Sequence, residues 1–149
     1  FHPQGQYHTI SLGAVIDGRR NIYLCGHDGI TKHSPDGRLL WNFSRPGLTI
    51  PTVASLSDSA LFGSAHQGEL FSLDLETGKR LWSTKVSDEI AGDTGFVTTH
   101  DGIVIGGVDS KANEYNSQVV ALGAADGRHV WKFTPDAAVW NFMALYPGD

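Results

Sequence analysis

The sequence is poor in cysteine and methionine, with one residue of each kind among 149. The single thiol, Cys25, can form neither an internal disulfide nor a cluster of thiolate metal ligands, and we expect it to pack as a small apolar side chain. The chain also lacks any run of the ~18 to 20 apolar residues that a membrane-spanning helix needs. Membrane contact is therefore expected to be peripheral at most.

Concentrated positive charge is missing as well. Eleven Lys and Arg residues stand against 16 Asp and Glu residues, which gives a net charge of -5, and no basic run is longer than the pair Arg19 and Arg20. Proteins bind a phosphate backbone through a clustered Lys/Arg face. Nucleic acid is therefore not an expected partner.

Glycine, by contrast, is abundant: 18 glycines and six prolines indicate many turns. Apolar residues make up 40% of the chain and charged residues 18%, within the range of one ordinary globular domain. The runs between the turns are rich in Val, Ile, Leu, Thr, Phe and Trp, which favour strands. These features predict an all-β fold without helices.

A Gly, three intervening residues and a Trp recur three times, at Gly37 to Trp41, Gly78 to Trp82 and Gly127 to Trp131. The tryptophans are 41 and 49 positions apart, and each unit reads as several short strands. A period of this size is typical of propeller blades. We therefore predict a partial β-propeller of about three four-stranded antiparallel blades plus the first strand of a fourth.

The whole chain, residues 1–149, is interpreted as a single propeller segment. Its blades are expected at about residues 11–43, 50–86 and 95–133, with the start of the next blade at 139–149. Complete propellers have about four to eight blades. The ring is therefore expected to be completed by residues outside this sequence or by another chain, and the simplest interpretation is a segment of a longer propeller.

The repeated residues have a common physical explanation. A glycine at a tight turn can adopt the left-handed backbone, and a tryptophan on the strand that leaves the turn has enough apolar area to cover a neighbouring blade. Burial of one such ring contributes about 2 to 3 kcal/mol. We predict that successive blades are docked by Gly37, Trp41, Gly78, Trp82, Gly127 and Trp131.

The third unit contains an insertion, roughly residues 108–117, which is expected to form a long polar loop. Loops of this kind tend to carry contacts that are specific to a protein. The candidate residues for contact with a partner are Asp109, Lys111, Glu114 and Tyr115. The spacing of Asp109, Asn113 and Glu114 does not match a calcium-binding loop, so a solvated insertion is favoured.

No catalytic, cofactor-binding or metal-ligating residue is predicted. His27 and His66 occupy comparable hairpins, and a ring of imidazoles at one end of a propeller could bind metal. The third unit has no histidine in that place. Hairpin histidines that are solvated or bonded to nearby backbone explain the pattern more simply, and no Ser/His/Asp arrangement can be argued from the sequence.

The segment from Ser72 to Trp82 resembles the tryptophan-docking motif of the pyrroloquinoline-quinone-like (quinoprotein-type, BamB-like) propeller repeat, Ala-x-Asp-x-x-Thr-Gly-x-x-x-Trp. Asp74, Thr77, Gly78 and Trp82 match it, and Ser72 replaces the alanine. The segment 121–131 is similar at Ala121, Gly127 and Trp131, with Gly123 in the Asp place and Asp126 in the Thr place. Residues 31–41 match more loosely. The resemblance covers about residues 11–133 and implies that Asp74, Thr77 and Ala121 also take part in blade docking.

The resemblance leaves two main functions open. Quinoprotein dehydrogenases of this family hold the quinone and calcium, using adjacent cysteines, a catalytic Asp, and Glu and Asn ligands, whereas BamB-like assembly factors are periplasmic scaffolds without a cofactor. This chain has no Cys-Cys pair. We therefore expect a noncatalytic scaffold or accessory subunit that mediates protein-protein interaction in a larger complex, with no cofactor and, by resemblance, an extracytoplasmic location. The alternatives are a fragment of a quinone-dependent dehydrogenase whose cofactor site lies on blades not present, or a ligand-sensing propeller.

Overall fold

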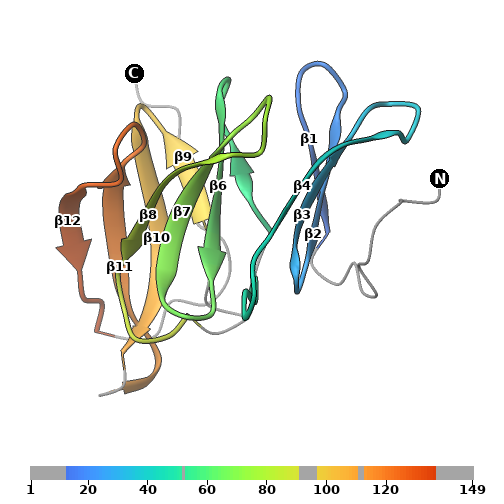
Figure 1. The fold of residues 1–149 in the computed structure, drawn as a ribbon. Coiled ribbons are helices and arrows are strands. Elements are labelled where there is room, and N and C mark those ends of the chain that lie inside the picture. Colours follow the sequence, from blue (N-terminus) through green and yellow to red (C-terminus); the bar gives the residue numbers. More distant parts are fainter. Residues whose placement is uncertain (1–12, 52, 91–96, 111–112, 137–149) are drawn as a thin grey trace.

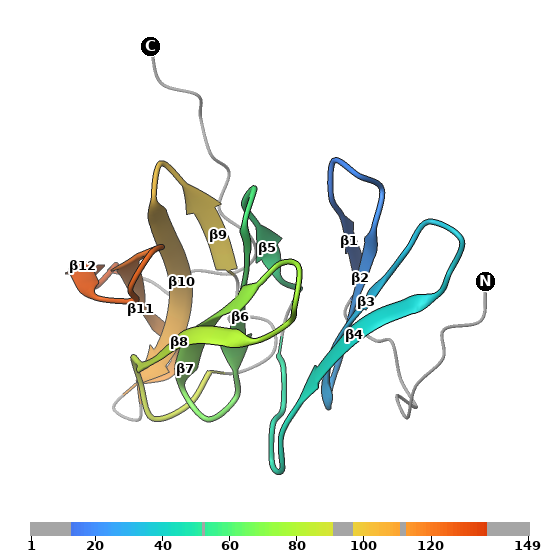
Figure 2. The same cartoon turned by 45° about the horizontal axis from the view of Figure 1, so that its top comes forward.

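A computed structural model describes residues 13–51, 53–90, 97–110 and 113–136 of the chain (Figure 1). Within these ranges the regular structure consists of β-strands, and they contain no helix that could cross a membrane. Three separate four-stranded sheets lie side by side in chain order (Figures 1 and 2). The predicted all-β fold of three four-stranded antiparallel sheets is confirmed. The expected start of a fourth blade, at 139–149, lies outside the described residues.

Each sheet is a simple meander in which every strand pairs antiparallel with the next. The first sheet comprises β1 (Ala14–Ile16), β2 (Ile22–Gly26), β3 (Gly29–His33) and β4 (Leu39–Ser44). The second comprises β5 (Ser55–Leu56), β6 (Ala60–Ala65), β7 (Glu69–Asp74) and β8 (Arg80–Lys85). The third comprises β9 (Val97–His100), β10 (Ile103–Ser110), β11 (Asn113–Gly123) and β12 (His129–Phe133).

The segment 108–117 differs from the predicted loop. Strand β10 continues to Ser110 and β11 begins at Asn113, so the two strands form one long hairpin. Val108 pairs with Gln118 and Ser110 with Asn113, so the ladder continues past an irregularity in register between these two pairs. Asp109 lies in β10, Glu114 and Tyr115 lie in β11, and Lys111 is outside the described residues. Their role in partner contact stays a prediction.

The apolar core consists of two layers, one on each side of the second sheet. Strands β6 and β7 alternate between them because successive side chains of a strand point to opposite faces. Leu61 and Phe71 pack in the cluster shared with the first sheet, whereas Phe62 and Leu70 pack in the cluster shared with the third. The second sheet is thus covered on both faces. We call these layers the first junction and the second junction.

Candidate functional site

The first junction is held by a tryptophan from one sheet and a turn of the next. Trp41, on β4, donates its indole N–H to the carbonyl of Leu75 at 3.1 Å and is only 8% exposed. Gly78 has a φ of 69°, and a Cβ added to it would lie 2.7 Å from Cδ2 of Trp41. The indole therefore lies flat against a turn where only glycine fits.

The second junction repeats this contact. Trp82, on β8, donates its indole N–H to the carbonyl of Ala124 at 2.9 Å, and Gly127 has the same φ of 69° as Gly78. A Cβ added to Gly127 would lie 2.6 Å from Cε3 of Trp82. In addition, Thr84 donates a hydrogen bond to the Gly127 carbonyl at 2.7 Å. Each junction thus combines an indole, a left-handed glycine and a backbone carbonyl.

The other motif residues lie at the turns or outside these two contacts. Asp74 accepts hydrogen bonds at one oxygen from the amide of Thr77 at 2.7 Å and from its hydroxyl at 2.6 Å, and these bonds lower the pKa of Asp74. Ala121 is buried opposite Trp131, which is 41% exposed on β12. Gly37 has a φ of 91° in the corresponding turn of the first sheet. Neither Gly37 nor Trp131 joins two of the described sheets.

A second kind of contact, between each connecting segment and the sheet that precedes it, was missed by the sequence analysis. The amide of the fully buried Ile50 donates a hydrogen bond to the His27 carbonyl at 2.9 Å. In the same way, the amide of the fully buried Ile90 donates to the His66 carbonyl at 3.0 Å. Each isoleucine follows a docking tryptophan by eight or nine residues. That recurrence is the signal that could have revealed the contact.

The two histidines that invited a metal interpretation lie at these connecting segments. Nδ1 of His66 contacts the Ile90 carbonyl at 2.8 Å, and Nε2 contacts Glu89 at 2.8 Å. His27 is exposed in the turn between β2 and β3. Within the described part of the chain, no three His, Cys, Asp or Glu side chains are grouped as metal ligands.

The strand register shows how the repeat departs from its own pattern. Ser72 pairs with Trp82 and Ala121 with Trp131, but the residue that pairs with Trp41 is Lys32. In the sequence, the residue ten positions before Trp41, equivalent by spacing to Ser72 before Trp82, is Thr31. Lys32 and Trp41 are nine positions apart, whereas the paired residues in the other two sheets are ten apart. The turn between the paired residues is therefore one residue shorter in the first sheet, which moves the match by one. The first sheet therefore buries a lysine where the others place serine and alanine.

Ser72 provides a direct test of this position. Its hydroxyl is fully buried and has no hydrogen-bond partner among the described residues, and an unsatisfied buried polar group costs about 1 to 3 kcal/mol. Ser72→Ala is therefore expected to raise the free energy of unfolding by about 1 kcal/mol in urea denaturation. Ser64→Ala is the control, because buried Ser64 has a polar partner. A loss of stability in Ser72→Ala as large as that in Ser64→Ala would contradict the explanation.

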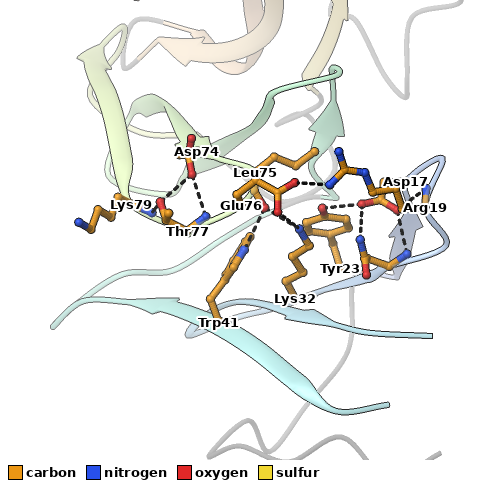
Figure 3. A network of polar contacts seen from close by, with 11 residues as sticks. Asp17, Arg19, Tyr23, Lys32, Trp41, Asp74, Leu75, Glu76, Thr77 and Lys79 are labelled. Carbon is orange, nitrogen blue, oxygen red and sulfur yellow. Dashed lines mark hydrogen bonds and ion pairs between the residues drawn. The ribbon is translucent and has the colours of Figure 1, made fainter. Parts of the chain in front are cut away.

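Lys32 is the centre of a polar network in the first junction (Figure 3). It is 2% exposed, donates to the Leu75 carbonyl at 2.8 Å and lies 3.8 Å from a carboxylate oxygen of Glu76. Its ammonium is also 5.5 Å from the ring centre of Tyr23, within the range of a cation-π contact. Glu76 in turn pairs with Arg19 at 2.9 Å. The network thus connects the first and second sheets.

Tyr23 extends this network to Asp17 in the turn after β1. The buried phenol donates to Asp17 at 2.9 Å, and burial together with this bond raises the pKa of Tyr23. Burial also raises the pKa of Asp17, but hydrogen bonds from Asn21, Tyr23 and Arg19 outweigh it and leave that pKa below its ordinary value. Asp17 is therefore an ionised acceptor that fixes the turn and the phenol together.

This arrangement predicts a pH-dependent contribution to stability. Because the folded pKa of Asp17 is lower than its ordinary value of 3.8, its contribution is present above pH 3.8 and is lost as the pH falls through the folded pKa. Asp17→Asn is expected to cost about 1 kcal/mol at pH 7, since bonds to a charged acceptor are screened at this half-exposed turn. Urea unfolding is measured at pH 7 and at pH 3. The difference in the free energy of unfolding between wild type and Asp17→Asn should be smaller at pH 3. An equal difference at both would contradict the role of the charge.

Among the described residues, the second junction has no counterpart of this network. Tyr23 pairs with Lys32, and the matching pair in the second sheet is Phe62 with Ser72. The position after the bonded carbonyl is Glu76 in one turn and Ala125 in the other. Since the second junction forms without these charges, the fold of the repeat does not require them. This makes the first junction the strongest candidate for a specific function.

A cleft of about 490 Å³ opens beside this network. It lies between the turn after β1, the turn after β5 and the turn after β7, so residues of two sheets form its walls. Its lining comprises Ile16, Asp17, Gly18, Arg19, Leu56, Ser57, Asp58, Leu75 and Glu76. The cleft combines an apolar wall with charged groups and has the size of a ligand or side-chain binding site.

Meandering four-stranded sheets docked by tryptophans define a quinoprotein-like β-propeller. A family model described as outer membrane protein assembly factor BamB matches residues 26–141. The chain belongs to this family of pyrroloquinoline-quinone-like repeat proteins. It is also 32% identical over 115 residues to the polyvinylalcohol dehydrogenase of Sphingopyxis sp. (strain 113P3), covering 64% of this chain and 18% of that protein.

Solved structures share the fold at low sequence identity. BamB from Moraxella catarrhalis superposes with a TM-score of 0.67 at 16% identity, covering 83% of this chain and 35% of that one. A europium-containing methanol dehydrogenase superposes with a TM-score of 0.69 at 19% identity, covering 82% of this chain and 24% of that one. The chain therefore spans between about a fifth and about a third of the length of these relatives. Their similarity shows the propeller fold.

Proposed function

We propose that the chain forms part of a β-propeller that serves as a noncatalytic scaffold or accessory subunit for protein-protein interaction in a larger, extracytoplasmic complex. The observation that carries this proposal is the chemistry of the first junction. Lys32, Tyr23 and Asp17 are each bonded to other protein atoms, so they fix the turns around the cleft. A rigid cleft between sheets is suited to receiving a partner. The match to the BamB family model supports the same proposal.

A second candidate is part of a quinone-dependent dehydrogenase, which the 32% identity to a polyvinylalcohol dehydrogenase favours. The described residues include no group of three His, Cys, Asp or Glu side chains placed to hold a metal. In this candidate, the cofactor would be held by residues outside the described ranges.

The test uses the full-length protein. It is purified, mixed with pyrroloquinoline quinone and Ca²⁺, and assayed for quinone absorbance and for dye-linked oxidation of polyvinyl alcohol and primary alcohols. In parallel, its native assembly is measured by sedimentation and chemical cross-linking. The scaffold proposal expects a stable complex with a second protein and no dye reduction. Quinone-dependent dye reduction would overturn it in favour of the dehydrogenase.

A further inference from the structure

The lining of the cleft at the first junction is of two chemical kinds. Ile16, which is 64% exposed at the end of the edge strand β1, and Leu56, on β5, are apolar. Asp58 and Glu76 are acidic, and the side chain of Glu76 is 64% exposed. An apolar surface beside carboxylates is complementary to a side chain with a long methylene stem and a charged head.

The charges at the cleft favour a cation. The lining contains three carboxylates, of Asp17, Asp58 and Glu76, against one guanidinium, that of Arg19. The ammonium of Lys32 lies behind Glu76, with a side chain that is only 3% exposed, and counting it still leaves one more carboxylate than cations. Asp17 is already occupied by its own turn and by Tyr23. Asp58 is exposed and makes no ion pair or hydrogen bond with any residue that the structure describes.

The network behind the cleft fixes the position of Glu76. Arg19 holds one carboxylate oxygen at 2.9 Å and Lys32 lies 3.8 Å from the other, while the neighbouring Leu75 carbonyl accepts bonds from both Lys32 and Trp41. A pre-organised acceptor loses less conformational entropy on binding. Because the second junction lacks these groups, the arrangement is an addition to the repeat at this one place.

We propose that this cleft is the docking site for a basic, extended segment of the protein partner, which deepens the scaffold function proposed above and rests on it. A Lys or Arg side chain lies with its head between Asp58 and Glu76 and with its methylenes against Ile16 and Leu56. The volume of about 490 Å³ accommodates one such side chain and the backbone on either side of it.

The test measures binding of a short labelled peptide, acetyl-Gly-Lys-Leu-Lys-Gly amide, to the full-length protein by fluorescence anisotropy, with the same peptide carrying Glu in place of Lys as the comparison. Asp58→Asn is expected to weaken binding of the basic peptide by about fivefold, the upper end of one exposed ion pair, and Ile16→Ser is expected to weaken it as well. Affinity should fall as salt is raised. Asp28→Asn is the matched control, since Asp28 is exposed in the turn after β2, at the end of the first sheet opposite to the turn after β1 that lines the cleft, and it should leave the affinity unchanged.

Equal affinity for the basic and acidic peptides, preference for the acidic one, or equal effects of Asp58→Asn and Asp28→Asn would overturn the proposal. The outcome can be separated from that of the scaffold function. If the protein forms a stable complex with a second protein but the peptide measurements give one of these results, the scaffold stands and this docking site is wrong. If the protein proves to be a quinone-dependent dehydrogenase, the scaffold function itself fails, and the partner assignment of the cleft fails with it.

Discussion

Replacing Gly78 with alanine is expected to lower the free energy of unfolding by about 3 kcal/mol. The loss has two causes: the added methyl group overpacks the interface, and a side chain at this positive φ is strained. The methyl group would lie 2.7 Å from Cδ2 of Trp41. That indole is 8% exposed and bonded to Leu75, so it cannot move aside without opening the first junction. Urea denaturation of the full-length protein measures the loss.

Gly102→Ala is the matched control for this substitution. Gly102 has a φ of 74°, close to the 69° of Gly78, but a Cβ added there would meet no atom within 4 Å. It should therefore cost only about 1 kcal/mol, the backbone part of the effect. The difference between the two variants isolates the contact with Trp41. Equal losses would show that the turn conformation alone determines the requirement for glycine.

The recurring spacing of glycine and tryptophan could be found from the sequence because its requirements are local. A turn that needs positive φ selects glycine, and the strand that leaves it starts at a fixed offset, so Gly78 and Trp82 keep the same spacing as Gly127 and Trp131. The number of sheets and the order of strands within them follow from the same repetition. These features are encoded within short stretches of the chain.

The polar network could not be found in this way because it depends on register and on contacts between sheets. Lys32 reaches Leu75 across 43 positions of sequence, and its equivalence to Ser72 becomes visible only from the residue opposite each tryptophan. A turn one residue shorter was enough to assign the position to Thr31. The available signal was a lysine, Lys32, within an otherwise buried strand. Because a lysine is almost never fully buried without a partner, its position there indicates a polar partner on a neighbouring segment.

The long hairpin of the third sheet shows a different limit. The polar composition of residues 108–117 predicted a loop, because charged and amide side chains favour solvent. The structure instead pairs Ser110 with Asn113 beyond the buried Val108. Backbone hydrogen bonds along a ladder do not depend on side-chain polarity, so composition alone could not distinguish a loop from an extended hairpin.

Trp41→Ala is expected to be the most destabilising of the proposed substitutions, with a loss of about 3 to 5 kcal/mol in the free energy of unfolding. The indole contacts the turn at Gly78 and stacks edge-on against Tyr23, with ring centres 5.8 Å apart. Its removal leaves a cavity between two sheets that the backbone of the turns cannot fill. Trp41→Phe should lose less, because an aromatic ring remains and the Leu75 carbonyl keeps its bond from Lys32.

The double variant Trp41→Ala/Gly78→Ala distinguishes docking from general loss of core. With the indole gone, the methyl group at position 78 no longer meets an atom of Trp41, and only the cost of positive φ remains. The combined loss should therefore be smaller than the sum of the single losses by about 2 kcal/mol, the packing part of the Gly78→Ala effect. The cycle is measured by urea denaturation of all four proteins. Additive losses would mean that the glycine and the indole act independently, and the first junction would then need another explanation for its stability.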